Sequence, residues 1–198
     1  MHLPAAPPPG TELSPAVEHL LETFVPAGSH CLNVGGRDGT AVRDWLGGRG
    51  CSHVDEDVAR ASELRFEDES FDAALLIGVL DRLRAPQLAA SELRRVLRPG
   101  GVLLATATNG AYWRHRLDRA ARAGQPPVAT VSPGSLRRLL LQGGFSLVGV
   151  EGQDGAFIRD MPLAGRLWKR RGSGPYRVAE RFFPSLLGSS VGAFAIRI

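Results

Sequence analysis

The 198-residue chain has almost no lysine, little cysteine and no long apolar stretch. Lys169 is its only lysine, so arginine carries nearly all of the positive charge. Two cysteines, Cys31 and Cys51, are too few for a disulfide scaffold or a zinc site, and we expect no metal. No apolar run reaches the roughly 18 residues of a membrane-spanning helix. The Pro-rich start also lacks the charged-then-apolar pattern of a signal peptide. We therefore expect a soluble cytoplasmic protein with no membrane partner.

Charge is distributed unevenly along the chain. The formal net charge is +4, but residues 1–110 hold ten arginines against fifteen acidic residues, a net −5. Residues 111–198 hold fourteen basic and five acidic residues, a net +9. Such asymmetry can mark a surface for anionic ligands, nucleic acid or an acidic partner. The alternative is an arginine-biased composition in which basic residues simply coat the second half.

The length and composition predict one globular domain. Residues 1–13 are expected to be a disordered Pro-rich head, and residues 14–198 a single domain with an Arg/Gly-rich insertion at 152–190. Apolar periodicity and Gly/Pro punctuation predict helices over 15–25, 41–46, 86–97, 111–123 and 133–143. Strands are predicted over 30–34, 51–54, 71–78, 102–108, 145–150 and 191–198.

Strands that alternate with helices, and that are apolar on both faces, indicate a doubly wound α/β sheet. In such sheets a ligand binds beyond the carboxyl ends of the strands, at the point where strand order reverses. This rule places the expected site at the Gly35–Gly39 turn, Asp55, Ile77–Asp81 and Asn109.

The turn after the first strand is rich in glycine and reads G-G-R-D-G over residues 35–39. Glycine lets a ligand approach the backbone closely, and the following helix N-terminus favours polar or anionic groups. The turn lacks the G-x-G-x-x-G spacing of dinucleotide-binding folds, and no G-x-x-x-x-G-K-[ST] phosphate loop occurs in the chain. By itself the turn indicates either a nucleotide-like ligand or a tight structural turn.

Three further segments follow the turn in order. Residues 64–72 read L-R-F-E-D-E-S-F-D, residues 79–83 read V-L-D-R-L, and residues 92–101 read E-L-R-R-V-L-R-P-G-G. Together they resemble the L-P-F-x-D-x-S-F-D, V-L-E-H and R-x-L-K-P-G-G motifs of the class I S-adenosylmethionine-dependent methyltransferases, especially the type 11 domain. The resemblance covers about residues 30–150 and implies a Rossmann-like methyltransferase sheet with S-adenosylmethionine as the cofactor.

The resemblance also implies a set of cofactor-binding residues, namely Asn33, Gly35, Gly36, Arg37, Gly39, Asp55 and Ile77. The first family motif, D/E-x-G-x-G-x-G, has Asn33, Gly35, Arg37 and Gly39 at its four defining positions. Asn33 keeps a hydrogen-bonding group but loses the charge. Arg37 either pairs with the carboxylate at the methionine end of the cofactor, points to solvent or closes the pocket. Asp55 matches the acid that holds the ribose hydroxyls; its alternative is a solvated loop acid.

A deletion follows Asp55. Only residues 56–63 separate Asp55 from Leu64, where the family has a helix and a third strand. We therefore expect a sheet without that strand, and a last strand that is antiparallel at or beside the edge. Arg60 falls where the family has an aspartate that contacts the adenine amino group. Asp81 and Arg82 replace the Glu-His pair of the family.

The implied activity is methyl transfer to a small molecule or glycan precursor. An activated methyl group requires mainly alignment of the acceptor, so the catalytic residues stay unknown, with Tyr112, His115 and Asp81 as candidates. Asn109 to Leu117 and Phe183 to Gly188 also resemble segments of the MetW family, which is thought to support a homoserine acyltransferase. The alternative is therefore a decayed methyltransferase fold that serves a protein partner. Nucleic-acid binding is a third alternative, but no nucleic-acid module is recognisable.

Overall fold

The computed structural model describes residue 13 and residues 15–35, 39–109, 131–153 and 190–198. Its elements are α1 (Pro15–Phe24), β1 (His30–Val34), α2 (Gly39–Gly48), β2 (Ser52–Glu56), η1 (Val58–Arg60), β3 (Phe71–Leu76), η2 (Leu80–Arg82), α3 (Pro86–Val96), β4 (Leu97–Thr108), α5 (Pro133–Gln142), β5 (Phe145–Gln153) and β6 (Ser190–Arg197). The predicted helix over 111–123, most of the predicted head and nearly all of the predicted insertion lie outside the described residues.

The described strands form one sheet in the order β2-β1-β3-β4-β6-β5. Neighbouring strands from β2 to β4 pair in parallel, whereas β6 is antiparallel to both β4 and β5. Strand order reverses beside β1, because β2 lies on one side of it and β3 on the other. The predicted doubly wound α/β sheet is confirmed, and so is the prediction of an antiparallel last strand beside the edge strand.

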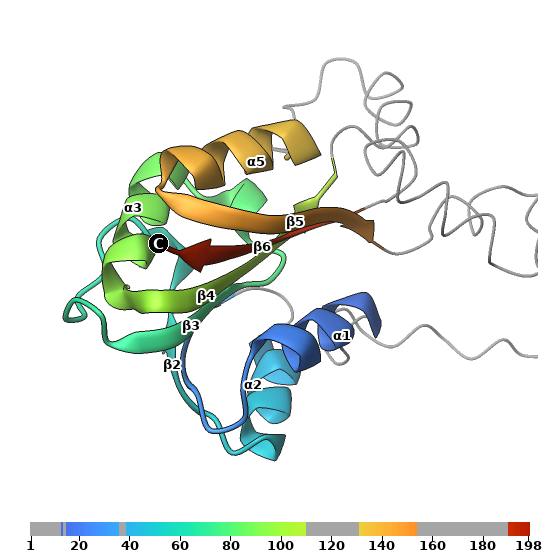
Figure 1. The fold of residues 1–198 in the computed structure, drawn as a ribbon, viewed down its shortest axis with the longest axis vertical. Coiled ribbons are helices and arrows are strands. Elements are labelled where there is room, and N and C mark those ends of the chain that lie inside the picture. Colours follow the sequence, from blue (N-terminus) through green and yellow to red (C-terminus); the bar gives the residue numbers. More distant parts are fainter. Residues whose placement is uncertain (1–12, 14, 36–38, 110–130, 154–189) are drawn as a thin grey trace, which may run out of the picture.

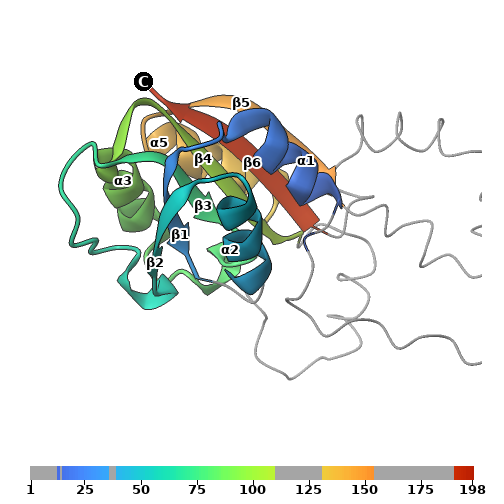
Figure 2. The same cartoon turned by 90° about the horizontal axis from the view of Figure 1, so that it is seen from below.

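Helices cover both faces of the sheet (Figures 1 and 2), with α1 and α2 on one face and α3 and α5 on the other. The alternation of side chains along each strand creates two cores. On β1, Cys31 packs in the cluster that contains residues of α1 and α2, while Leu32 and Val34 pack in the cluster that contains residues of α3 and α5. No helix among the described residues is long and apolar enough to cross a membrane.

The segment between β2 and β3 contains only the short helix η1, so the predicted loss of the third strand is confirmed. Strand β2 is consequently an edge strand. The guanidinium of Arg95 on α3 fastens the shortened segment, because it donates to the carbonyls of Leu64 and Phe66, both at 2.8 Å, and to Asp68 Oδ1 at 2.7 Å. It also pairs with Glu92 at 2.9 Å. The arginine of the R-x-L-R-P-G-G motif thus holds the chain where the strand is missing.

Several strand boundaries differ from the predictions, most clearly those of β2 and β4. Strand β2 extends to Glu56 instead of ending at Val54, so Asp55 lies within the strand and is paired with Asn33. Consecutive acids are poor strand formers, but an edge strand leaves such side chains in water. Strand β4 begins at Leu97, with a register shift that accommodates residues 98–101. The predicted stop of α3 at this sequence is nevertheless confirmed, because α3 ends at Val96.

Candidate functional site

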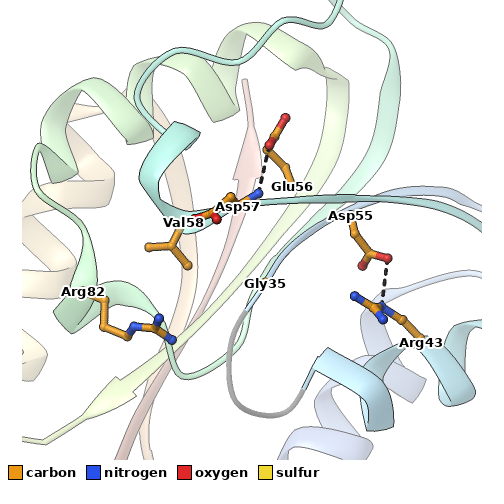
Figure 3. A pocket seen from close by; sticks show the side chains of 7 residues that line it. All are labelled: Gly35, Arg43, Asp55, Glu56, Asp57, Val58 and Arg82. Carbon is orange, nitrogen blue, oxygen red and sulfur yellow. Dashed lines mark hydrogen bonds and ion pairs between the residues drawn. The ribbon is translucent and has the colours of Figure 1, made fainter.

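A cavity of about 350 Å³ opens at the carboxyl ends of β1 and β2 (Figure 3). This volume lies within the range of small-molecule sites, roughly 300–1,000 Å³. Its lining comes from the ends of β1 and β2, from α2 and from the two short helices, and consists of Gly35, Arg43, Asp55, Glu56, Asp57, Val58 and Arg82. The cavity therefore lies where the strand-order rule places a ligand.

The carboxylate of Asp55 is bound on both oxygens. Asn33 donates its side-chain N–H to Asp55 Oδ1 at 2.6 Å, and Arg43 Nε lies 2.8 Å from Oδ2 (Figure 3). Asn33 is only 1% exposed, whereas the side chains of Asp55 and Arg43 are 34% and 47% exposed. Asp55 is therefore a fixed, ionic acceptor at the cavity wall, and its position is set by a buried amide on the neighbouring strand.

Gly35 lies where the backbone turns out of β1. Its N–H donates to the carbonyl of Glu56 at 2.8 Å, which ties β1 to the end of β2. A Cβ at Gly35 would lie 3.3 Å from the same carbonyl, which is a tight contact. Gly35 also lines the cavity, so a side chain there would narrow the space for a ligand, and close approach favours glycine at this position. Gly39 begins α2, and Gly36 and Arg37 lie outside the described residues.

The remaining predicted site residues follow β3 and β4. Ile77 is 4% exposed and packs in the core beneath α1 and α2, so only its backbone can meet a ligand. Asp81 Oδ1 is buried and has no hydrogen-bond partner in the described structure. Asn109 is fully buried and forms an isolated parallel β-bridge with Val131. Tyr112 and His115 lie outside the described residues.

Five lining residues were not predicted as site residues, namely Arg43, Glu56, Asp57, Val58 and Arg82. Arg43 reaches the cavity from α2, whereas Glu56 and Asp57 were interpreted only as solvated neighbours of Asp55. The Asp57 carboxylate caps η1 by accepting the N–H of Ala59 at 2.8 Å. Nothing in the sequence distinguishes Arg43 from the other exposed arginines, because its partner Asp55 is on another element.

The two cysteines lie away from the cavity and are buried, as expected for small apolar side chains. Burial, with a smaller contribution from the neighbouring Cys51, raises the pKa of Cys31 to about 12. A thiol with such a pKa is almost never ionised at neutral pH. Cys31 therefore has no role as a nucleophile.

Comparison with known proteins shows which folds this sheet resembles. Residues 39–105 match a family described as a methyltransferase domain. An S-adenosylmethionine-dependent methyltransferase from Aquifex aeolicus has a TM-score of 0.63 at 16% identity, over 96% of this chain and 94% of that chain. The (4+2)-cyclase SpnF has a TM-score of 0.56 at 19% identity, over 96% and 84% of the two chains.

A third similar structure is a complex between the Haloferax volcanii Trm112 methyltransferase activator and a protein assigned as a methyltransferase. It has a TM-score of 0.57 at 14% identity, over 91% of this chain and 88% of that chain. Comparison with curated proteins gives no significant match. At these identities the structures show the fold alone, and the resemblance to MetW stays a prediction. Residues 39–105 thus match a methyltransferase domain, and the sheet has the fold of the S-adenosylmethionine-dependent methyltransferases.

Proposed function

We propose that the protein binds S-adenosylmethionine in the cavity at the ends of β1, β2 and β3, and transfers its methyl group to a small molecule or glycan precursor. The observation that supports this most is that Gly35 and Asp55 line the same cavity. A glycine that leaves room for a ligand and a fixed carboxylate that accepts from hydroxyls are what a nucleoside needs.

The described residues fit the cofactor in most respects. Asp55 is placed to accept hydrogen bonds from ribose hydroxyls, and the backbone at Gly35 leaves space for the thioether chain. Val58 supplies an apolar surface at the far side of the cavity. Asn33 takes no direct part, because its amide is used to orient Asp55. Gly36, Arg37 and Gly39, the first residue of α2, remain predicted contacts.

When bound, S-adenosylmethionine supplies a methyl group on a sulfonium that is already activated for transfer. The protein then has to align the acceptor and exclude competing water. Asp81, next to the lining residue Arg82, is our candidate for taking a proton from an acceptor, because its buried Oδ1 has no donor in the described structure. A buried oxygen without a donor is costly, and a bound hydroxyl or amine would remove that cost.

Calorimetric titration with S-adenosylhomocysteine, the demethylated product, tests the proposed function. We expect saturable one-site binding that is weakened by Asp55→Ala. The control is Asp44→Ala, because Asp44 is an exposed acid of α2 that does not line the cavity. No binding by the folded protein, or equal affinity for both variants, would contradict the proposal.

The second candidate is a regulatory protein with a methyltransferase fold that acts through a partner. Asp55 is already bound by Asn33 and Arg43, which leaves fewer lone pairs for a ribose. The wall normally built by a third strand is also absent between β2 and β3. One structural neighbour is found together with an activator protein. A folded protein that binds no S-adenosylhomocysteine but co-purifies with a specific partner would favour this candidate.

A further inference from the structure

We infer that Arg82 forms one wall of the base-binding end of the cavity and stacks its guanidinium on the purine ring, opposite Val58. This inference rests on the proposed function, since it assigns the contact that holds the adenine of the cofactor. Arg82 stands where the related motif has histidine, and it follows β3 in the short helix η2. In this role Arg82 replaces part of the cavity wall that the third strand forms in the family.

The first argument is the position of the two side chains. Val58 follows β2 and Arg82 follows the end of β3, and these strands flank β1 in the sheet. Strands are spaced by about 4.8 Å, so β2 and β3 are separated by about 10 Å. A flat ring in contact on both faces needs about 7 Å between the flanking heavy atoms, from two contacts of about 3.5 Å. The separation of the two strands therefore leaves room for a ring between the two side chains.

Figure 3 shows both side chains at the same end of the cavity, on the side away from the Arg43–Asp55 pair. Val58 packs against the core on the α3 side, so it is a supported apolar surface. The ribose acceptor Asp55 and the base-binding pair thus occupy opposite ends of one cavity. A nucleoside spans such an arrangement from its hydroxyls to its base.

The second argument is the state of the Arg82 guanidinium. Arg82 is exposed, and within the described part of the chain its guanidinium has no carboxylate within ion-pair distance and no hydrogen bond. The other arginine of the cavity, Arg43, is engaged by Asp55. A planar cation without a partner is free to lie over an aromatic face, where guanidinium groups stack well. Binding of a base would then cost no existing ion pair.

The test compares two ligands with two forms of the protein. S-Adenosylhomocysteine carries the base, and S-ribosylhomocysteine has the same sugar and amino acid without it. We expect Arg82→Ala to lower the affinity for S-adenosylhomocysteine by about five- to thirty-fold, which is the range for a cation over a ring. The affinity for S-ribosylhomocysteine should stay unchanged. Unchanged binding of the second ligand also shows that the variant is folded.

Two further variants sharpen the result. Arg82→Tyr supplies a flat side chain without charge, and we expect it to retain most of the affinity for S-adenosylhomocysteine. The control Arg84→Ala removes a neighbouring exposed arginine that does not line the cavity, and it should change neither affinity. Equal loss for both ligands would overturn the stacking role, because it would mean that Arg82 acts through its charge on the sugar or amino acid.

Unchanged binding of S-adenosylhomocysteine by Arg82→Ala would also overturn the inference while leaving the proposed function intact. In that case Arg82 faces the methyl acceptor or solvent. Failure of the unaltered protein to bind S-adenosylhomocysteine at all would instead overturn the proposed function, and the role of Arg82 with it.

Discussion

Asn33 and Asp55 are directly opposite each other on adjacent parallel strands, and the amide of Asn33 donates to the carboxylate of Asp55 at 2.6 Å. The related motif has an acid at the position of Asn33. An acid there would place two carboxylates side by side, with one of them buried, and like charges opposite each other are destabilising. In this chain the amide instead joins the two positions by a hydrogen bond, and it holds Asp55 in place without such repulsion.

Replacing the amide by a carboxylate tests this relationship. We expect Asn33→Asp to lower the free energy of unfolding by about 1–3 kcal/mol at pH 8, because a hydrogen bond becomes a repulsion. Repulsion raises the pKa of one carboxyl of the pair in the folded variant. A raised folded-state pKa stabilises the protonated form, so the loss should shrink as pH is lowered toward 5. Urea unfolding at several pH values measures the effect.

The double variant Asn33→Asp, Asp55→Asn is the matched control. It restores one amide and one carboxylate in exchanged positions, and we expect it to recover much of the stability that Asn33→Asp loses. If Asn33→Asp is as stable as the unaltered protein at pH 8, the hydrogen bond does not set the position of Asp55.

The glycine at the end of β1 gives a second prediction. Gly35→Ala places a Cβ 3.3 Å from the carbonyl of Glu56, which the edge strand β2 can accommodate by a small shift. We expect a stability loss of at most about 1 kcal/mol but a loss in S-adenosylhomocysteine affinity on the order of tenfold, because the methyl group enters the cavity. Thermal unfolding and calorimetry separate the two effects.

Gly47→Ala is the control for this experiment. Gly47 lies in α2, and apart from its own helix turn no atom lies within 4 Å of a Cβ at that position. We expect unchanged affinity and, if anything, a gain of up to about 1 kcal/mol in stability from helix propensity. A large stability loss in Gly35→Ala, with unchanged affinity per folded molecule, would assign Gly35 a purely structural role.

The fastening of the shortened segment by Arg95 gives a third prediction. Arg95→Ala leaves the carbonyls of Leu64 and Phe66 without this donor and breaks the ion pairs to Asp68 and Glu92. We expect a loss of about 2–3 kcal/mol, and only partial recovery in Arg95→Lys, because an ammonium cannot reproduce the forked geometry. Arg84→Ala should lie within about 0.5 kcal/mol of the unaltered protein.

The ion pair between Arg95 and Glu92 also predicts how the stability depends on pH. The hydrogen bond from Arg95 is the main reason that the pKa of Glu92 lies below its ordinary value. A lowered folded-state pKa contributes stability above the unfolded-state pKa, and this contribution is lost as pH falls through the folded-state pKa. The stability difference between the unaltered protein and Arg95→Ala should therefore decrease below about pH 4. A difference that stays constant from pH 7 to 3 would show that the ion pair adds nothing.

The burial of the cysteines gives a fourth prediction. With a pKa of about 12, Cys31 should resist alkylation by iodoacetamide at pH 8 in the native protein and react promptly after unfolding in guanidinium. Mass spectrometry of the peptides measures the extent at Cys31 itself. Rapid and complete labelling of native Cys31 would show that the β1 core opens far more readily than its burial implies.

The sequence predicts the positions of the strands well because buried strands appear as apolar runs in it. The predicted strand over 30–34 coincides with β1, since its side chains pack in the cores on both faces. The missing strand follows from chain length alone, because eight residues between Asp55 and Leu64 cannot form a helix and a strand. These features are local, so one sequence is enough to recognise them.

The candidate site is less predictable because its contacts join distant elements. Asp55 was predicted to face a ribose, but its contacts with Asn33 and Arg43 depend on the register of β1 with β2 and on the orientation of α2. The common cavity of Val58 and Arg82 depends on two short helices that carry no periodic pattern. Apolar periodicity reports which residues are buried, and it carries no information on which polar groups meet.

A crystal structure of the protein with bound S-adenosylhomocysteine tests the central claim most directly. We expect the ligand across the ends of β1, β2 and β3, with its ribose hydroxyls within hydrogen-bond distance of Asp55 and its base between Val58 and Arg82. A ligand bound elsewhere, or no ligand in crystals grown at saturating concentration with the cavity open to solvent, would contradict the account.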